Sequence, residues 1–358
     1  MSRALLTFAA LVLAFSAFAS AQSYTIIDLG VLKGKNESSG FWINDLGDVV
    51  GCSDTQTSMG YPCTGLVAGQ RAFYWSRGKG MKDLGTLSGG SVSGALGLND
   101  SGVVVGYSNV KGQPPTNFIA VRWSPTGTIR NLGTLSGGSS SAAFQVNSGG
   151  EVSGDSFLSS GLVNATRWTH DKINNLGKLK NAIFTAGLAI NDNGLIVGES
   201  VFSYGPPFTS HGFLWNGSAM KDLGTLRGGL TSMANAINAS GVIVGQSDGA
   251  STLGHWHAVK WDASGNIKDL GVLQGGTYSV AFGVNGSDVV VGYGNIATNA
   301  PHAMIWTASH GIRDLNSLIP KNSGWTLINA NSINNVGQIT GYGSHNGHNH
   351  AFVLTPVN

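Results

Sequence analysis

Short runs of β-branched residues recur along the chain, and each follows a polar turn. Two of them are "VVVGYS" from Val103 and "VIVGQS" from Val242, which come after the turns "NDSG" and "NASG". Runs of this length and composition predict buried strands, and Asn followed by Gly favours a tight turn. A segment such as "ALGLN" precedes the turn, and an alternating segment such as "AFYW", ending at Trp75, follows the run. The pattern predicts an all-β chain of short antiparallel strands.

A motif related to "DLG" recurs with this pattern and shows that the units are repeats. It occurs seven times, at Asp28, Asp83, Asn131, Asn175, Asp222, Asp269 and Asp314. Six copies place an Asn sixteen residues later, as from Asp83 to Asn99, and every copy then places a Gly seven residues after that Asn, as at Gly106. Constant lengths indicate a hydrogen-bonded framework, whereas variable lengths indicate loops. Four antiparallel strands in a repeat of this size are typical of a β-propeller blade.

The two ends of the chain supply parts of one more blade. Tyr24 to Asp28 resemble a "DLG" strand with no Trp strand before it, and His350 to Leu354 resemble a Trp strand with no "DLG" strand after it. We therefore predict an all-β, seven-bladed β-propeller with four antiparallel strands per blade. Its ring is closed by the N-terminal strand pairing with the C-terminal blade. An open solenoid is the alternative, but it needs capping repeats.

The glycine-rich stretch "KDLGTLSGG", residues 82–90, is interpreted as a crossover between blades. Read alone, it suggests a loop that holds phosphate with its backbone N–H groups. However, it recurs around the ring, lacks the Gly-Lys-Ser/Thr ending, and is followed by no helical pattern.

Residues 1–21 have the features of a secretory signal peptide. Arg3 precedes an apolar run, and Ala19-Ser20-Ala21 fits the small-x-small cleavage site. The remaining residues, 22–358, are predicted to form a single propeller domain, secreted to the periplasm or the cell exterior and monomeric. No later segment is apolar for long enough to span a membrane. Charged residues make up 11% of the chain and the formal net charge is +2, which argues against a nucleic-acid partner.

The chain has two cysteines, Cys52 and Cys63, inside the longest insertion between strands. In an oxidising compartment they most simply form a disulfide that closes this loop. The alternative is a metal-binding or redox pair, but the spacing is not Cys-x-x-Cys and no further ligand lies nearby in the sequence.

A His-Ala-Phe step at His350-Ala351-Phe352 has near copies elsewhere in the chain. These are His211-Gly212-Phe213, His257-Ala258-Val259 and His302-Ala303-Met304. Together with the "DLGTL…GG", "IN…G" and "VVG" elements, they resemble the HAF-type extracellular repeat family over nearly all of residues 22–358. Three repeats depart from it and carry Arg71, Ile119 and Asn164 at the His position. The resemblance implies a secreted bacterial repeat protein, but it names no substrate.

Variable loops join the second and third strands of each repeat and share a face with the crossovers between blades. Binding residues usually lie on such loops. The candidates are Tyr204, Phe208, His255, Trp256, His345 and His348. Trp42 is a further candidate, because its equivalents on the other inner strands are mostly small, and it is expected to plug the central channel or line a pocket there. The alternative for the loop candidates is that their rings only hold their own loops in place.

We expect no metal and no cofactor. His257 and His350 occupy a repeated position, where a structural hydrogen bond explains them, and His255 lies in a different repeat from His345 and His348. His345, His348 and His350 could still hold a stray divalent ion.

The best candidate pair for catalysis is Asp155 and Glu199, each directly after the strand glycine of adjacent repeats. A glycosidase needs two carboxylates roughly 5 to 9.5 Å apart, and equivalent positions on neighbouring blades are expected to lie farther apart. Our leading hypothesis is a non-catalytic secreted scaffold that binds a glycan or protein through its loop-bearing face. The alternatives are a polysaccharide-acting hydrolase or lyase that uses Asp155 and Glu199, and a purely structural role.

Overall fold

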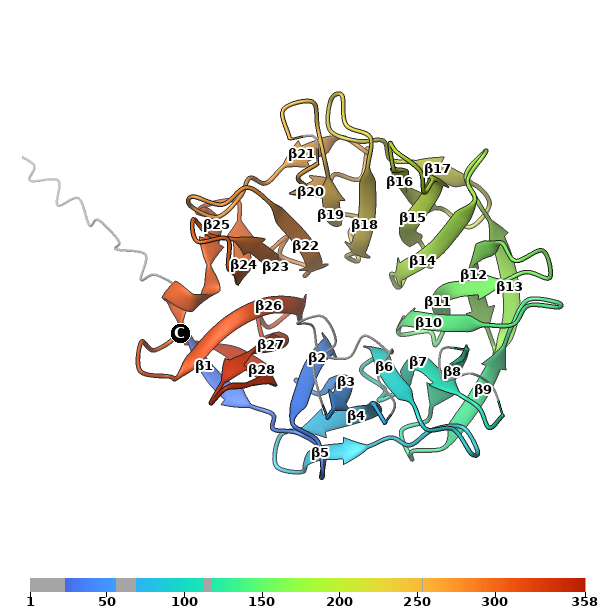
Figure 1. Ribbon diagram of the computed structural model, residues 1–358, viewed down its shortest axis with the longest axis horizontal. Coiled ribbons are helices and arrows are strands. Elements are labelled where there is room, and N and C mark those ends of the chain that lie inside the picture. Colours follow the sequence, from blue (N-terminus) through green and yellow to red (C-terminus); the bar gives the residue numbers. More distant parts are fainter. Residues whose placement is uncertain (1–22, 56–68, 113–116, 253, 358) are drawn as a thin grey trace, which may run out of the picture.

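The protein folds as a set of β-sheets arranged in a ring (Figure 1). The structure, a computed structural model, describes residues 23–55, 69–112, 117–252 and 254–357. Within these ranges it has 28 strands and one short 3-10 helix, η1 (Leu315–Leu318). No helix in the described ranges is long and apolar enough to cross a membrane.

Five sheets have four strands each. The first two contain β2 (Glu37–Ile43), β3 (Val49–Asp54), β4 (Arg71–Ser76) and β5 (Gly80–Asp83), and β6 (Ser93–Leu98), β7 (Val104–Asn109), β8 (Phe118–Trp123) and β9 (Ile129–Gly133). The next two contain β18 (Ser232–Ile237), β19 (Ile243–Ser247), β20 (His257–Trp261) and β21 (Ile267–Asp269), and β22 (Ser279–Val284), β23 (Val290–Asn295), β24 (Pro301–Thr307) and β25 (Gly311–Asp314). The fifth contains β26 (Trp325–Ile333), β27 (Ile339–His345), β28 (His348–Val357) and β1 (Ser23–Asp28).

The remaining eight strands form one sheet. They are β10 (Ser141–Val146), β11 (Val152–Phe157), β12 (Val163–Thr169), β13 (Lys172–Gly177), β14 (Phe184–Ile190), β15 (Ile196–Ser203), β16 (Thr209–Trp215) and β17 (Met220–Asp222). One parallel pair, Val163 with Phe184, joins the first four strands to the last four. The predicted all-β propeller is thus confirmed, with five separate four-stranded blades. The count of seven is not confirmed, because the other eight strands share a single sheet.

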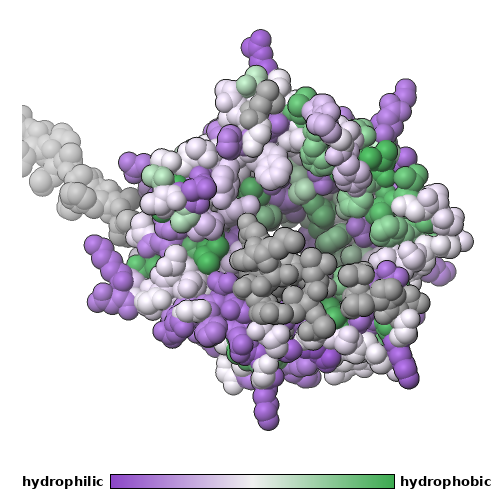
Figure 2. Space-filling view, in the orientation of Figure 1, coloured by the Kyte–Doolittle hydropathy of each residue, from purple (hydrophilic) through white to green (hydrophobic). Residues whose placement is uncertain are grey.

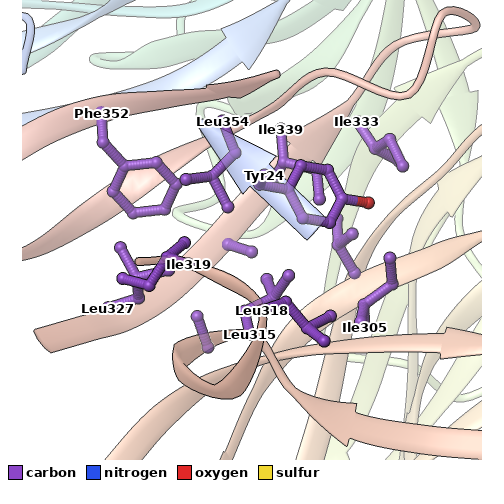
Figure 3. Close-up of a cluster of buried hydrophobic side chains, with 13 residues drawn as sticks. Tyr24, Ile305, Leu315, Leu318, Ile319, Leu327, Ile333, Ile339, Phe352 and Leu354 are labelled. Carbon is purple, nitrogen blue, oxygen red and sulfur yellow. The ribbon is translucent and has the colours of Figure 1, made fainter. Parts of the chain in front are cut away.

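The predicted ring closure is confirmed. β1 pairs antiparallel with β28, from Ser23 opposite Val357 to Asp28 opposite Phe352. Figure 3 shows Tyr24 of β1 among the hydrophobic side chains of the last sheet, and Tyr24 and Leu354 are both buried in this cluster. The first strand therefore contributes both backbone pairing and core side chains to the C-terminal blade.

Seven buried asparagines form a closed circle of hydrogen bonds around the channel. Each donates from its side-chain amide to the backbone carbonyl of the next, over 2.9 to 3.3 Å; they are Asn44, Asn99, Asn147, Asn191, Asn238, Asn285 and Asn334. Each side-chain oxygen also accepts the backbone N–H four residues later, as from Val103 to Asn99. This asparagine circle explains why the repeat has an Asn at this position, because each amide both closes its own turn and binds its neighbour.

The constant glycine after each Asn also has a structural cause. Gly106 on β7 lies opposite a bulge in β6, where the register shifts between Ala95 and Gly97. A Cβ atom at Gly106 would overlap the carbonyl oxygen of Gly94, and the corresponding glycines of the other repeats face the same obstacle. A side chain there would therefore disrupt the pairing of the two innermost strands.

The recurring tryptophans anchor neighbouring blades. Trp123 is buried against Val50 and Ala72 of the preceding sheet. Its indole N–H donates to the carbonyl of Leu84, 2.8 Å away in the crossover between the two sheets. Trp168 and Trp261 make the same bond to Leu132 and Leu223.

Candidate functional site

Exposed hydrophobic side chains gather on one face of the ring, over β11 to β20. They are Phe157, Leu162, Ile183, Tyr204, Phe208, Leu230 and Trp256, with exposed fractions from 37% to 65%, and we call them the apolar strip. β11 begins beside Asn147 of the asparagine circle and ends at Phe157, so the strip lies at the opposite end of the strands from the circle. Figure 2 shows hydrophobic surface over this part of the ring.

Backbone pairing makes the first part of the strip continuous across two sets of strands. Phe157 at the end of β11 pairs with Val163, the residue after Leu162. Val163 in turn pairs with Phe184, the residue after Ile183, at the start of β14. Phe157, Leu162 and Ile183 are therefore held on adjacent segments by the junction within the eight-stranded sheet.

The loop between β15 and β16 carries the most exposed ring of the strip. Tyr204 is 65% exposed, and its ring centroid lies 6.3 Å from that of Phe208, with the cis Pro206–Pro207 bond between them. Partial burial and the nearby Glu199 carboxyl both raise the pKa of Tyr204. The Tyr204 hydroxyl can donate a hydrogen bond.

The last part of the strip is tied to the next sheet. Ser210, two residues after Phe208, forms an isolated parallel bridge with Thr231, which follows Leu230. The indole N–H of Trp256 donates to the Thr231 hydroxyl over 3.0 Å, so this ring is fixed, although 42% of the residue is exposed. A fixed aromatic side chain can offer contact area at little entropic cost.

Two exposed cations lie in the crossover loops that carry Ile183 and Leu230. They are Lys180 and Arg227, which occupy the same place in their repeats. Positive charge therefore lies in the same loops as these two members of the apolar strip.

Asp155 and Glu199 lie on the second strands of adjacent repeats, β11 and β15. Asp155 pairs with Ala142 and Ala165 on the flanking strands. Burial raises its pKa to about 7, although a backbone hydrogen bond from Ala142 opposes the shift. Burial also raises the pKa of Glu199, against a hydrogen bond from the Ser210 hydroxyl. A carboxyl group with a pKa of about 7, as at Asp155, can donate a proton near neutral pH, which is the task of a general acid.

Trp42 lines the channel at the end that carries the asparagine circle. The cavity there has a volume of about 190 Å³, and Asn44, Asn99 and Gln145 also line it. Trp42 is partly buried against the cluster that contains Leu98 of β6. The sequence-based expectation that this ring reaches the channel agrees with its place, whereas its role in ligand binding stays a prediction.

The histidine candidates occupy two separate parts of the ring. His255 is exposed beside Trp256. His345 Nδ1 lies 2.9 Å from Asp28 of β1, and His348 Nδ1 lies 3.5 Å from Glu37. The sequence does not bring Asp28 and His345 together, because they are 317 positions apart in the chain.

The repeated His positions form hydrogen-bonded pairs with the Asp of the "DLG" motif. The pairs are His211 with Asp222, His257 with Asp269, His302 with Asp314, and His350 with Asp28. The interpretation of His257 and His350 as structural hydrogen-bonding residues agrees with these contacts.

Sequence reasoning missed the aliphatic members of the strip. The positions equivalent to Ile183 and Leu230 hold Ser91, Ser139 and Thr277 in other repeats. A comparison of the crossovers, position by position, would have shown polar residues replaced by apolar ones in just two adjacent repeats.

Two predictions fall wholly or partly outside the described residues. Cys52 is buried on β3, but its predicted partner Cys63 lies outside the described ranges, so the disulfide stays a prediction. Residues 1–21, the predicted signal peptide, lie outside them as well.

No family model and no curated protein matches the chain. Among solved structures, the β-propeller domain of the Trilobed protease from Pyrococcus furiosus has a TM-score of 0.57 at 7% identity, covering 90% of this chain and 94% of that one. A puromycin-hydrolyzing peptidase of Mycobacterium tuberculosis has a TM-score of 0.54 at 11% identity, covering 86% of this chain and 49% of its own. TolB from Acinetobacter baumannii has a TM-score of 0.47 at 12% identity, covering 69% of this chain and 59% of its own. This chain thus spans about half of the peptidase and three fifths of TolB. The likeness to the Trilobed protease domain and the peptidase is one of propeller fold.

Proposed function

We propose that this propeller is a non-catalytic scaffold that binds a protein segment along the apolar strip. The observation that carries the proposal is that exposed hydrophobic side chains gather on one face of three consecutive repeats, on segments that are partly joined by backbone pairing. Large contiguous apolar patches on a soluble surface typically mark interaction sites. Their supporting loops are tied together by backbone pairing, so a partner meets a surface that is already organised.

The composition of the strip favours a protein segment over a glycan. Leu162, Ile183 and Leu230 are aliphatic and offer no stacking face for a sugar ring, while they suit the apolar side chains of a peptide. The exposed cations Lys180 and Arg227 add positive charge beside them. The expected partner therefore carries apolar side chains flanked by carboxylates.

A variant based on the chain's own repeats tests this proposal. Ile183→Ser with Leu230→Thr installs residues found at the equivalent crossover positions, Ser139 and Thr277, so the fold should be retained. Displayed peptides and a glycan array are screened against both proteins. We expect peptides with apolar and acidic residues to bind at least 10-fold more weakly to the variant. Equal peptide binding by both proteins, or glycan binding that depends on these residues, contradicts the proposal.

A specific observation favours the enzymatic alternative as a second candidate. Burial raises the pKa of Asp155 to about 7, which suits a general acid, and Glu199 lies at the equivalent position of the next repeat. In this alternative the protein is a polysaccharide-acting hydrolase or lyase. Reducing ends released from a panel of bacterial and plant polysaccharides, and lost in Asp155→Asn, would establish it.

We further propose that the eight-stranded sheet counts as two blades, which makes the ring seven-bladed. The support is that one residue pair joins its halves, and that each half contributes one asparagine to the circle of seven. We also propose that the chain is a secreted HAF-type repeat protein. The support for this is the repeated His-Ala-Phe step and the features of residues 1–21.

A further inference from the structure

One repeat differs from the others in how its His–Asp pair is surrounded. In three pairs, such as His257 with Asp269, a single imidazole contacts the carboxylate. At the ring closure, two imidazoles contact the carboxylate of Asp28. His350 Nδ1 lies 2.9 Å and His345 Nδ1 also 2.9 Å from its Oδ2 atom.

We propose that Asp28, His345 and His350 form a binding site for a divalent transition metal, with Zn²⁺ as the probe. One ligand atom from each residue lies within 4.8 Å of the others. Zinc with bonds of about 2.1 Å in a tetrahedron holds its ligand atoms about 3.4 Å apart, so the two contacts at 2.9 Å would open by about half an ångström. Two imidazoles and a carboxylate are a donor set that suits zinc and leave a coordination position for water.

An aromatic neighbour holds the imidazole of His345 in place. Trp325 stacks on the His345 ring, with centroids 4.6 Å apart and planes 8° apart. The side chains of His345 and His350 are 21% and 19% exposed and that of Asp28 is 31% exposed, so an ion can reach them from solvent. The sequence-based expectation of no metal weighed the histidines without Asp28, which joins them only through the fold.

The three ligands come from the two ends of the chain. Asp28 ends β1, whereas His345 ends β27 and His350 lies on β28. A bound ion would link the N-terminal strand to the C-terminal hairpin at the closure of the ring. Because such an ion binds the closed ring and not the opened one, it stabilises closure by mass action.

Isothermal titration of untagged, EDTA-treated protein with Zn²⁺ tests the proposal, with Mg²⁺ as a hard-cation comparison. We expect one Zn²⁺ per chain, at least 10-fold weaker binding in His345→Ala, and unchanged binding in His257→Ala, the matched variant in a two-residue pair. Absence of Zn²⁺ binding to the wild type, equal binding by His345→Ala, or equal loss in His257→Ala would overturn it.

Hydrogen exchange of the wild type gives a readout that needs no variant. We expect Zn²⁺ to slow exchange of the β1 amides paired with β28 at least 10-fold, while β20 and β21, which hold the His257–Asp269 pair, do not change. Slowing at both places, or at neither, contradicts a metal site at the closure.

Discussion

The side-chain amide of Asn334 donates a hydrogen bond to the backbone carbonyl of Asn44, which is 2.9 Å away in space and 290 positions away in the chain. The oxygen of the same side chain accepts the backbone N–H of Gln338 over 2.7 Å. One buried amide thus closes its own turn and links the last sheet to the first. This bond completes the asparagine circle.

Removing this amide should destabilise the ring measurably. Asn334→Ala leaves the Asn44 carbonyl and the Gln338 N–H without this partner in a buried place, at a cost of about 1 to 3 kcal/mol in the free energy of unfolding. Asn193→Ala is the control, because Asn193 also bonds across to a neighbouring sheet but is exposed. Urea denaturation of both variants should show the larger loss for Asn334→Ala. Equal losses would mean that the circle adds no more than an exposed contact.

Substitutions at Tyr24 separate the stability that its buried ring adds from the cost of burying its hydroxyl group. The residue is 1% exposed, and no group in the described ranges hydrogen-bonds its hydroxyl. Burial raises its pKa to about 12. Tyr24→Phe should therefore leave stability unchanged or raise it by about 1 kcal/mol, whereas Tyr24→Ala should lower it by about 3 to 5 kcal/mol. Thermal and urea unfolding would measure both. A Tyr24→Ala protein as stable as the wild type would show that the closing strand adds little.

The raised pKa of Asp155 predicts a dependence of stability on pH. Its pKa is about 7 in the folded state, against about 3.9 for an unfolded Asp. Between these values the folded state retains a proton that the unfolded state has lost, so this group makes stability fall as the pH rises from about 4 to about 7. The slope is at most about 1.4 kcal/mol per pH unit.

Asp155→Asn provides the comparison, because the neutral amide resembles the protonated carboxyl. Urea denaturation at several values between pH 4 and 7 should show a flatter profile for this variant than for the wild type. The carboxyls of Asp28 and Asp222 have lowered pKa values, since their histidine partners and backbone N–H groups outweigh the effect of burial. Their stabilising contribution is lost only as the pH falls below this window. Parallel profiles for wild type and variant would remove Asp155 as the cause.

The predicted disulfide between Cys52 and Cys63 can be checked by mass. Protein isolated from an oxidising compartment should be two hydrogens lighter than its reduced form. Reduction should cost about 3 kcal/mol or less, because the loop that the bond closes is short. Cys52→Ser with Cys63→Ser is the matched variant and should behave like the reduced protein. Two thiols that react with an alkylating agent in the unreduced, unfolded protein would contradict the disulfide.

The sequence was most informative where one interaction recurs in every repeat. The fixed interval from Asn99 to Gly106 marks a turn closed by an amide and a bulge that leaves no room for a Cβ atom. Because the same constraint acts around the ring, the pattern stands out within a single chain. The propeller fold follows from it, and the closure by β1 follows from the incomplete repeats at residues 24–28 and 350–354.

The rest depends on differences between repeats and on contacts that span the chain. β14 begins at Phe184, one position earlier than inner strands such as β10, and this residue makes the bridge that joins two sets of strands. The apolar strip arises from single substitutions in the crossovers, such as Leu230. The proposed metal ligands come together only when the fold places Asp28 next to His345. Because each of these features occurs in only one or two repeats, a pattern defined by what all repeats share does not reveal them.

Closure by β1 also fixes the order in which the native structure can be completed during synthesis. The Thr25 hydroxyl bonds the carbonyl of Thr355, 330 positions later, so the first strand of the described chain must wait for the last. Contacts this distant in sequence slow folding, because a long loop is ordered before they stabilise it. A nascent chain that stops short of β28 therefore carries β1 as an unpaired strand. The blade that closes the ring can therefore form only after every other strand of the described chain has been synthesised.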